Sequence, residues 1–141
     1  MLAACFSKNP AVLTTLIDSG ANVLARTHSG WHAIHFHEKG DCGTPDFKSA
    51  GAHVHTTAQV VHGLLNPDAN DNGDLPNIFA GADGSATAEI YSTLVSLKGA
   101  GGRPALLDAD GSAIVVHASP DDHKSQPIGG AGARAACGVI K

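Results

Sequence analysis

Apolar and imidazole side chains alternate from Ile34 to His37. Successive side chains of a β-strand point to opposite faces of a sheet. The alternation therefore predicts a strand on which Ile34 and Phe36 face a core while His35 and His37 share the other face. His32 falls on the apolar side of the same pattern. We expect it to be a buried structural histidine that hydrogen-bonds to the backbone.

Short apolar runs separated by turn residues continue this pattern through the second half of the chain. Strands are expected over residues 75–82, 85–91, 94–97, 105–107, 113–117 and 135–140. Residues 41–74 and 120–132 are long polar segments with little periodicity, and loops of that length in a compact domain are usually functional. Many short strands and long loops favour an all-β fold, a β-sandwich or barrel with Greek-key connections.

Residues 1–29 have a different pattern. Asn9 and Pro10 are placed to cap and begin a helix, apolar residues then recur at helical spacing, and Gly20 is placed to end it. This run resembles the second helix and following hairpin of an ankyrin repeat, but a single repeat does not make a stable array. We therefore interpret residues 1–29 as an ankyrin-like helical extension and residues 30–141 as a β domain.

Length and charge limit the classes of partner. The 141 residues are enough for one domain with its own core. The formal net charge of −4 provides no basic field for nucleic acid, and no apolar run is long enough to span a bilayer. We therefore expect neither nucleic acid nor a membrane as a partner.

The cysteines bear on the compartment. Cys5, Cys42 and Cys137 allow one disulfide and leave one thiol over. A disulfide would indicate an oxidising compartment, such as the periplasm or the extracellular space. The first residues, however, have neither the basic start nor the apolar stretch of a recognisable signal peptide. The compartment stays open.

Nine histidines are an unusual number for this length. Two imidazoles on one side of a rigid strand are spaced to bind a single metal ion, and imidazole is a ligand that suits copper and zinc. The alternative is a polar strand face that happens to carry His35 and His37. Motifs further along the chain favour the metal site, namely His53, His62, Asp71 to Asp74, and His117.

These motifs, followed by the closing segment Gly132 to Lys141, resemble the copper,zinc superoxide dismutases, in particular their bacterial branch. The resemblance extends from about Gly30 to Lys141. It implies a Greek-key β-sandwich or barrel of that type, shortened here at its N-terminus. It also implies dismutation of superoxide, a small anionic substrate, to O₂ and H₂O₂ by copper that cycles between Cu(II) and Cu(I).

The resemblance further implies two metal sites. Copper would be held by His35, His37, His53 and His117. Zinc would be held by His53, His62 and Asp74, with Asp71 at the position of the family's third zinc histidine. His53 would bridge the two ions and take up a proton when copper is reduced.

Three other features are implied in the same way. Asp121 matches the carboxylate that links a copper histidine to a zinc histidine and so orients both rings. Arg134 matches the arginine that attracts and positions the anionic substrate beside copper. Cys42 and Cys137 match the disulfide of the bacterial members.

Two departures from the family pattern leave alternatives open. Asp71 can ligate zinc, or it can leave the zinc site weak or empty, with His55 as a spare ligand. The family's first strands have no counterpart in residues 1–29, which predicts an apolar inner sheet face that needs a cover. Either the helix over residues 10–17 covers this face or another subunit does, and we expect a homo-oligomer, most simply a dimer. An alternative function is a catalytically weak copper- and zinc-binding protein for metal storage or delivery, with an ankyrin-like interaction segment.

Overall fold

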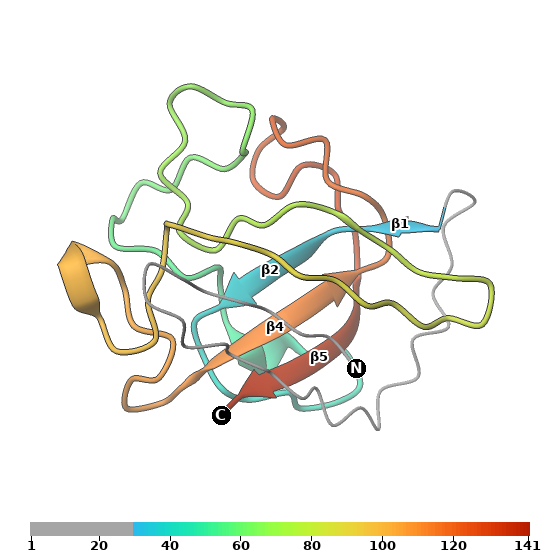
Figure 1. Cartoon of the computed structure of the whole chain (residues 1–141), viewed down its shortest axis with the longest axis horizontal. Helices are drawn as coiled ribbons and strands as arrows, with labels where there is room; N and C mark the ends of the chain where they lie inside the picture. The colour runs from blue at the N-terminus through green and yellow to red at the C-terminus, as the bar shows by residue number, and fades with distance from the viewer. Residues whose placement is uncertain (1–29) are drawn as a thin grey trace.

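The computed structural model describes residues 30–141, which are all-β with almost no helix (Figure 1). The elements in chain order are β1 (Trp31–His32), β2 (Ile34–His37), the 3-10 helix η1 (Lys48–Ala50), β3 (Ile78–Phe79), the 3-10 helix η2 (Ala100–Gly102), β4 (Ser112–His117) and β5 (Arg134–Ile140). Within the part of the chain that the structure describes, no helix has the length and apolar character to cross a membrane. The helix expected after Pro10 lies outside the described residues.

An antiparallel sheet in the order β2-β4-β5 carries the predicted histidine pair. Phe36 lies opposite Ile114 in this sheet, and His35 lies opposite Val115. Side-chain alternation therefore gives the sheet an inner face with Phe36 and Ile114 and a histidine face with His35. The predicted direction of each side chain in β2 is confirmed.

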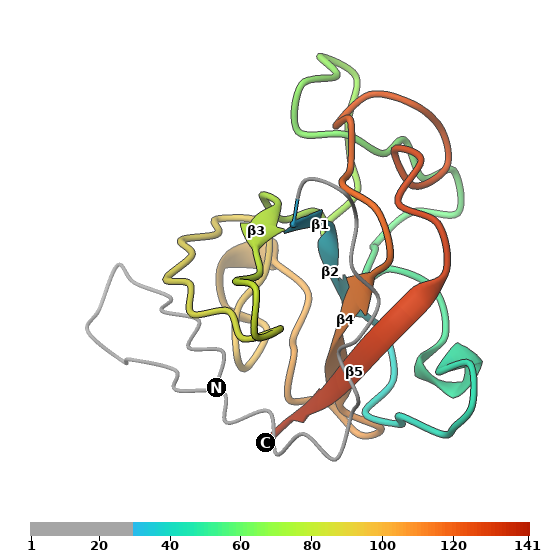
Figure 2. The same cartoon turned by 90° about the vertical axis from the view of Figure 1, so that its right-hand side faces the viewer.

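The inner face is covered by the chain itself. Ile34, Phe36 and Ile114 are at most 1% exposed and belong to the same apolar cluster as Leu75 and Leu106. Figure 2 shows the segment from β3 to η2 on one side of the three-stranded sheet and η1 on the other. Our expectation that the inner face would be left exposed was wrong, because the segment after the first long loop folds back over it.

The predicted hairpin around residues 82–84 is only partly formed. The turn is present, since the amide of Gly81 donates to the carbonyl of Ser85 at 2.8 Å. Residues 85–91 still alternate between half-buried and exposed positions, and Ala86 and Ile90 pack on the core. No ladder forms along them within residues 30–141, so the expected strand there was wrong although its period of two was right.

The other strand predictions have mixed outcomes. The strands expected over 113–117 and 135–140 are confirmed as β4 and β5. The segments at 94–97 and 105–107 are joined only by a parallel bridge between Ser96 and Ala105. Their apolar side chains, Val95 and Leu106, are nonetheless buried. The spacing of apolar residues thus predicted correctly which side chains are buried, but it predicted more hydrogen-bonded strands than the structure has.

A disulfide joins the first long loop to the last strand. Cys42 and Cys137 are bonded across 95 residues of sequence, as expected. Cys137 belongs to a small apolar cluster on the histidine face with Ala113 and Val115, and Cys42 and Phe47 pack against it. The bond therefore ties the start of a loop that carries site residues to the edge of the sheet.

Removing this bond should destabilise the protein. Closing a loop of this length restricts the unfolded chain by roughly 4–5 kcal/mol, so a Cys42→Ser/Cys137→Ser variant should melt on the order of 10 °C lower. Thermal unfolding followed by circular dichroism, with metal content held equal, measures the change. The variant itself is the control for reductant, which should lower the melting temperature of the native chain and leave that of the variant unchanged. An unchanged melting temperature of the native chain after addition of reductant would contradict the expectation.

Candidate metal centre

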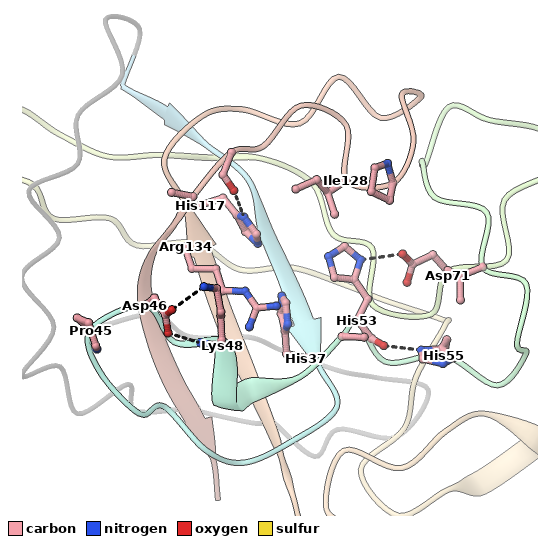
Figure 3. A pocket seen from close by; sticks show the side chains of 15 residues that line it. His37, Pro45, Asp46, Lys48, His53, His55, Asp71, His117, Ile128 and Arg134 are labelled. Atoms are coloured by element: carbon pink, nitrogen blue, oxygen red, sulfur yellow. Dashed lines mark hydrogen bonds and ion pairs between the residues drawn. The ribbon is translucent and has the colours of Figure 1, made fainter.

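Four histidine rings converge beside the histidine face of the sheet. They come from β2, from the end of β4 and from the first long loop, and they are His35, His37, His53 and His117. One ring nitrogen from each lies within 4.8 Å of the others. An isolated bridge pairs the backbone of His37 with that of His53, which brings the loop histidine to the strand. Figure 3 shows three of these rings, those of His37, His53 and His117, facing one space.

Each of the four rings makes one hydrogen bond and leaves one nitrogen unpaired. Nδ1 of His37 donates to the Gly51 carbonyl at 3.0 Å, and Nδ1 of His117 donates to the Gly132 carbonyl at 3.1 Å. The partners of His35 and His53 are carboxylates, described below. The nitrogens without a hydrogen-bond partner are Nδ1 of His35 and Nε2 of His37, His53 and His117. Buried polar atoms are normally paired, so these four atoms fit a metal ion that imidazole favours, such as copper.

Burial keeps these rings in the form that binds metal. It lowers the pKa of His37 to about 3 and that of His117 to about 4, and the nearby charge of Arg134 adds to both shifts. The pKa of His35 is also lowered by burial. Only a neutral imidazole has a lone pair to donate, so the pocket holds its histidines ready for a cation at neutral pH.

A second group adjoins the first through His53. It consists of His53, His62, Asp71 and Asp74, with one donor atom from each within 4.8 Å of the others. Nδ1 of His62 and Oδ1 of Asp74 are 2.6 Å apart but are not aligned for a hydrogen bond, and both are buried and unpaired. Two imidazoles and two carboxylates are a donor set that zinc accepts.

This second group has a strongly negative potential. Burial lowers the pKa of His62, but the carboxylates of Asp121, Asp71 and Asp74 outweigh it and raise that pKa to about 11. Burial raises the pKa of Asp71, but its contacts with His53 and His62 hold it well below the usual range. A cation in this group would balance the two carboxylates and take the place of the proton on Nδ1 of His62, which fits a zinc ion.

Asp121 connects the two groups. Its Oδ2 accepts a hydrogen bond from Nε2 of His35 at 3.0 Å, and its Oδ1 accepts one from Nε2 of His62 at 3.0 Å. Burial raises the pKa of Asp121, but these hydrogen bonds hold it far below its ordinary value. Because each ring donates a hydrogen bond to Asp121 through Nε2–H, Nδ1 is the nitrogen of each ring that is left for a metal. Asp121 thus contacts one ring of each group.

Gly129 packs directly on Asp121, a contact that the sequence pattern did not reveal. A Cβ atom built at Gly129 would lie 1.6 Å from Oδ1 of Asp121 and 3.0 Å from Nε2 of His62. The residue also has a positive φ of 58°. Only glycine fits, because the linking carboxylate occupies the space that a side chain would take. In the sequence this residue was only part of a Gly-rich loop.

Arg134 stands at the mouth of the first group. It lines an open pocket of about 710 Å³ together with His37, His53 and His117 (Figure 3). Its Nη1 donates to the Phe47 carbonyl at 2.7 Å and its Nη2 donates to the Gly51 carbonyl at 2.6 Å. A guanidinium has five N–H groups, so donors remain for an anion that enters the pocket.

Two other histidines have structural contacts. His32 is 2% exposed and its Nδ1 donates to the backbone carbonyl of His117 at 2.8 Å, which confirms its predicted role. His55 donates from Nδ1 to the carbonyl of His53 at 2.7 Å and joins neither group within residues 30–141. The idea of His55 as a spare ligand therefore receives no support from its position.

A model of the copper/zinc superoxide dismutase family (SODC) matches residues 9–140. The chain belongs to this family. Over 112 residues it is 89% identical to the Cu-Zn superoxide dismutase of Caulobacter vibrioides, an overlap that covers 79% of this chain and 64% of that protein. The chain thus spans just under two thirds of the length of this curated relative.

Solved structures support the superoxide dismutase type of fold. A SOD-like protein from Bacillus subtilis is 38% identical with a TM-score of 0.70, over 82% of this chain and 76% of that chain. The Cu/Zn superoxide dismutase from Brucella abortus is 30% identical with a TM-score of 0.58, over 80% of this chain and 73% of that chain. The predicted family and fold class are confirmed, whereas the family match from residue 9 gives the ankyrin-like interpretation no support.

The contact between Gly129 and Asp121 can be tested with a matched pair of substitutions. Gly129→Ala should cost about 3 kcal/mol or more of unfolding free energy, because the new methyl group displaces a buried, hydrogen-bonded carboxylate. It should also weaken zinc retention. Gly130 has a similar φ of 73° but nothing within 4 Å of an added Cβ. Gly130→Ala should therefore cost only about 1 kcal/mol of backbone strain.

Chemical denaturation gives the two free energies, and metal analysis after dialysis gives zinc retention. Equal effects of the two substitutions on both measurements would contradict the role assigned to the Gly129 contact.

Proposed function

We propose that this chain is a superoxide dismutase. Two superoxide anions and two protons give one O₂ and one H₂O₂. The observation that carries the proposal is the convergence of four unpaired, buried imidazole nitrogens beside an arginine that lines an open pocket. The family membership and the 89% identity to a Cu-Zn superoxide dismutase support it.

In this proposal His35, His37, His53 and His117 hold copper. When bound, copper supplies one-electron oxidation and reduction by alternating between Cu(II) and Cu(I). Hydrogen bonds to protein oxygens hold the four rings in fixed orientations, which would limit rearrangement between the two oxidation states. Of these four copper-group rings, that of His53 also belongs to the second group, so we assign to its Nε2 the proton that is held between the two half-reactions.

Arg134 is proposed to attract and position superoxide. The substrate is a small anion, and Arg134 brings positive charge close enough to lower the pKa of His37 and His117. Neighbouring Lys48 is 2.8 Å from Asp46, and both side chains are largely exposed, so this pair offers little net field. The local attraction therefore depends on Arg134 although the whole chain is acidic.

Zinc is proposed to occupy the second group, with His53, His62, Asp71 and Asp74 as ligands. Tetrahedral ligands at zinc distances lie about 3.3 Å from one another. The contacts from Asp71 and Asp74 to the two rings range from 2.6 to 3.9 Å, so small shifts would fit the four donors to one ion. The unpaired atoms on His62 and Asp74 support this occupant.

The alternative is a copper- and zinc-binding protein with little catalysis, which serves metal storage or delivery. It stays open because the chain spans only 64% of its 89% identical relative. The division at residues 29 and 30, with an ankyrin-like extension, likewise remains a prediction. Activity of the metal-loaded chain separates the two functions.

Dismutase activity should depend on Arg134. With copper and zinc loaded, the native chain should dismutate superoxide, be inhibited by cyanide, and slow as ionic strength rises. Arg134→Ala should lower the rate about tenfold or more at low salt and flatten the salt dependence, because the local positive field is removed. Stopped-flow decay of superoxide absorbance measures both effects.

Arg103→Ala is the matched control, since Arg103 bonds to the Ala100 carbonyl and does not line the pocket. It should leave the rate unchanged. A fully loaded native chain without activity would overturn the proposed function in favour of metal storage or delivery.

We also propose that the chain forms a homodimer. The surface proposed for this dimer is not the inner sheet face that the sequence suggested. Trp31 and Phe79 lie on paired strands, their rings meet edge to face at 5.4 Å, and they are 46% and 54% exposed. Exposed aromatic groups of this kind are typical of contact surfaces.

Phe79→Lys should lower the association state, because a charge cannot be buried there at low cost. Size-exclusion chromatography with light scattering should give a dimer mass for the native chain and a monomer mass for the variant. Leu107→Lys, at a 37% exposed site elsewhere, is the control. A native chain that is monomeric at micromolar concentration would contradict dimer formation.

A further inference from the structure

The His53 ring is oriented by a carboxylate of the protein itself, that of Asp71. Its Nδ1 lies 2.7 Å from Oδ2 of Asp71, and both residues are buried. Each of the other three rings of the first group also donates one hydrogen bond to a protein oxygen, which belongs to Gly51, Gly132 or Asp121. All four rings are therefore oriented by the chain's own acceptors.

The contact with Asp71 is specific. Oδ2 of Asp71 is 3.6 Å from Nδ1 of His62, and Oδ1 of Asp74 is 3.9 Å from Nδ1 of His53. Of the two carboxylates in the second group, Asp71 alone is within hydrogen-bond distance of the His53 ring. The pair is thus arranged for a proton between the two atoms.

The Asp71 carboxylate is itself held in place. Its Oδ1 accepts the amide of Gly73 at 2.9 Å, and the residue is 3% exposed. Its backbone amide donates to the Val61 carbonyl at 3.3 Å. A fixed acceptor restricts the rotation of the ring that donates to it.

The hydrogen bond also decides the tautomer. An ionised carboxylate can only accept, so Nδ1 of His53 carries the proton and Nε2 keeps its lone pair. Nε2 is the unpaired atom that faces the other three rings. A carboxylate that accepts a hydrogen bond from one ring nitrogen also makes the other nitrogen a more basic metal ligand. A histidine at position 71 would bring no such ionised acceptor.

We propose that Asp71 is a positioning residue that makes copper binding by this chain independent of zinc. With zinc absent, the Asp71 carboxylate does for Nδ1 of His53 what a zinc ion would do, by fixing the ring and presenting Nε2. Once zinc was bound, Asp71 and Nδ1 of His53 would serve as two of its ligands. This inference rests on the copper site of the proposed function, but not on turnover.

The first test uses the native chain with its metals removed. One equivalent of copper is titrated against a chelator of known affinity, with and without prior zinc loading. We expect the two copper affinities to agree within about threefold. A larger increase on zinc loading would overturn the proposal.

The second test reads the ring directly. Long-range ¹H–¹⁵N spectra of the metal-free native chain should show His53 protonated at Nδ1 and not at Nε2. The opposite tautomer would overturn the proposal. Neither this spectrum nor the affinity depends on dismutase activity, so an inactive chain would refute the proposed function while leaving this inference standing.

A matched pair of carboxylate deletions supplies the last test, with circular dichroism to verify folding. Asp71→Ala should lower copper affinity in zinc-free protein by 10- to 100-fold and mix the His53 tautomers. Asp71→Asn, which keeps a neutral acceptor, should restore part of both. Asp68→Ala removes an exposed carboxylate of the same loop that belongs to neither group, and it should leave zinc-free copper affinity unchanged. Equal copper losses from Asp71→Ala and Asp68→Ala would overturn the proposal.

Discussion

The packing of Ile34 and Phe36 into the core determines where the two strand histidines lie. Both side chains are fully buried, and the alternation of a strand then puts His35 and His37 on the opposite face. A shift of one residue in register would bury imidazoles in the apolar cluster and expose the core residues. The apolar cluster thus does more than stabilise the sheet, because it sets the register from which two of the four ring nitrogens converge.

Two buried carboxylates, Asp121 and Asp71, orient histidine rings that the sheet alone does not fix. Asp121 accepts hydrogen bonds from rings in both groups, and Asp71 accepts one from His53. Each carboxylate is expensive to bury alone, and each offsets that cost by taking several donors. The result is a set of rings whose free nitrogens are determined by which nitrogen faces a carboxylate. The protein's own hydrogen bonds therefore decide which nitrogen of each ring is left for a cation.

How much the sequence could predict follows from the range of each interaction. The alternation at Ile34–His37 and the backbone bond of His32 depend on local periodicity, and both are confirmed. The pairing of Cys42 with Cys137 came from family resemblance and is also confirmed. The cover of the inner face and the missing ladder at residues 85–91 depend on how distant segments fold back, which periodicity does not report. The fit of Gly129 against Asp121 depends on tertiary packing alone.

The loop that carries His53 is tied to β5 by two different bonds. Cys137 holds its beginning through Cys42, and Arg134 holds Phe47 and Gly51 through their carbonyls. Gly51 is also the acceptor for Nδ1 of His37, so one backbone carbonyl links the arginine to a ring of the first group. Two of the guanidinium donors are thus committed to structure, which restrains the group at the pocket mouth and leaves its remaining donors and its charge for an anion. A lysine at this position has no planar fork and could not make the same pair of backbone contacts while facing the pocket.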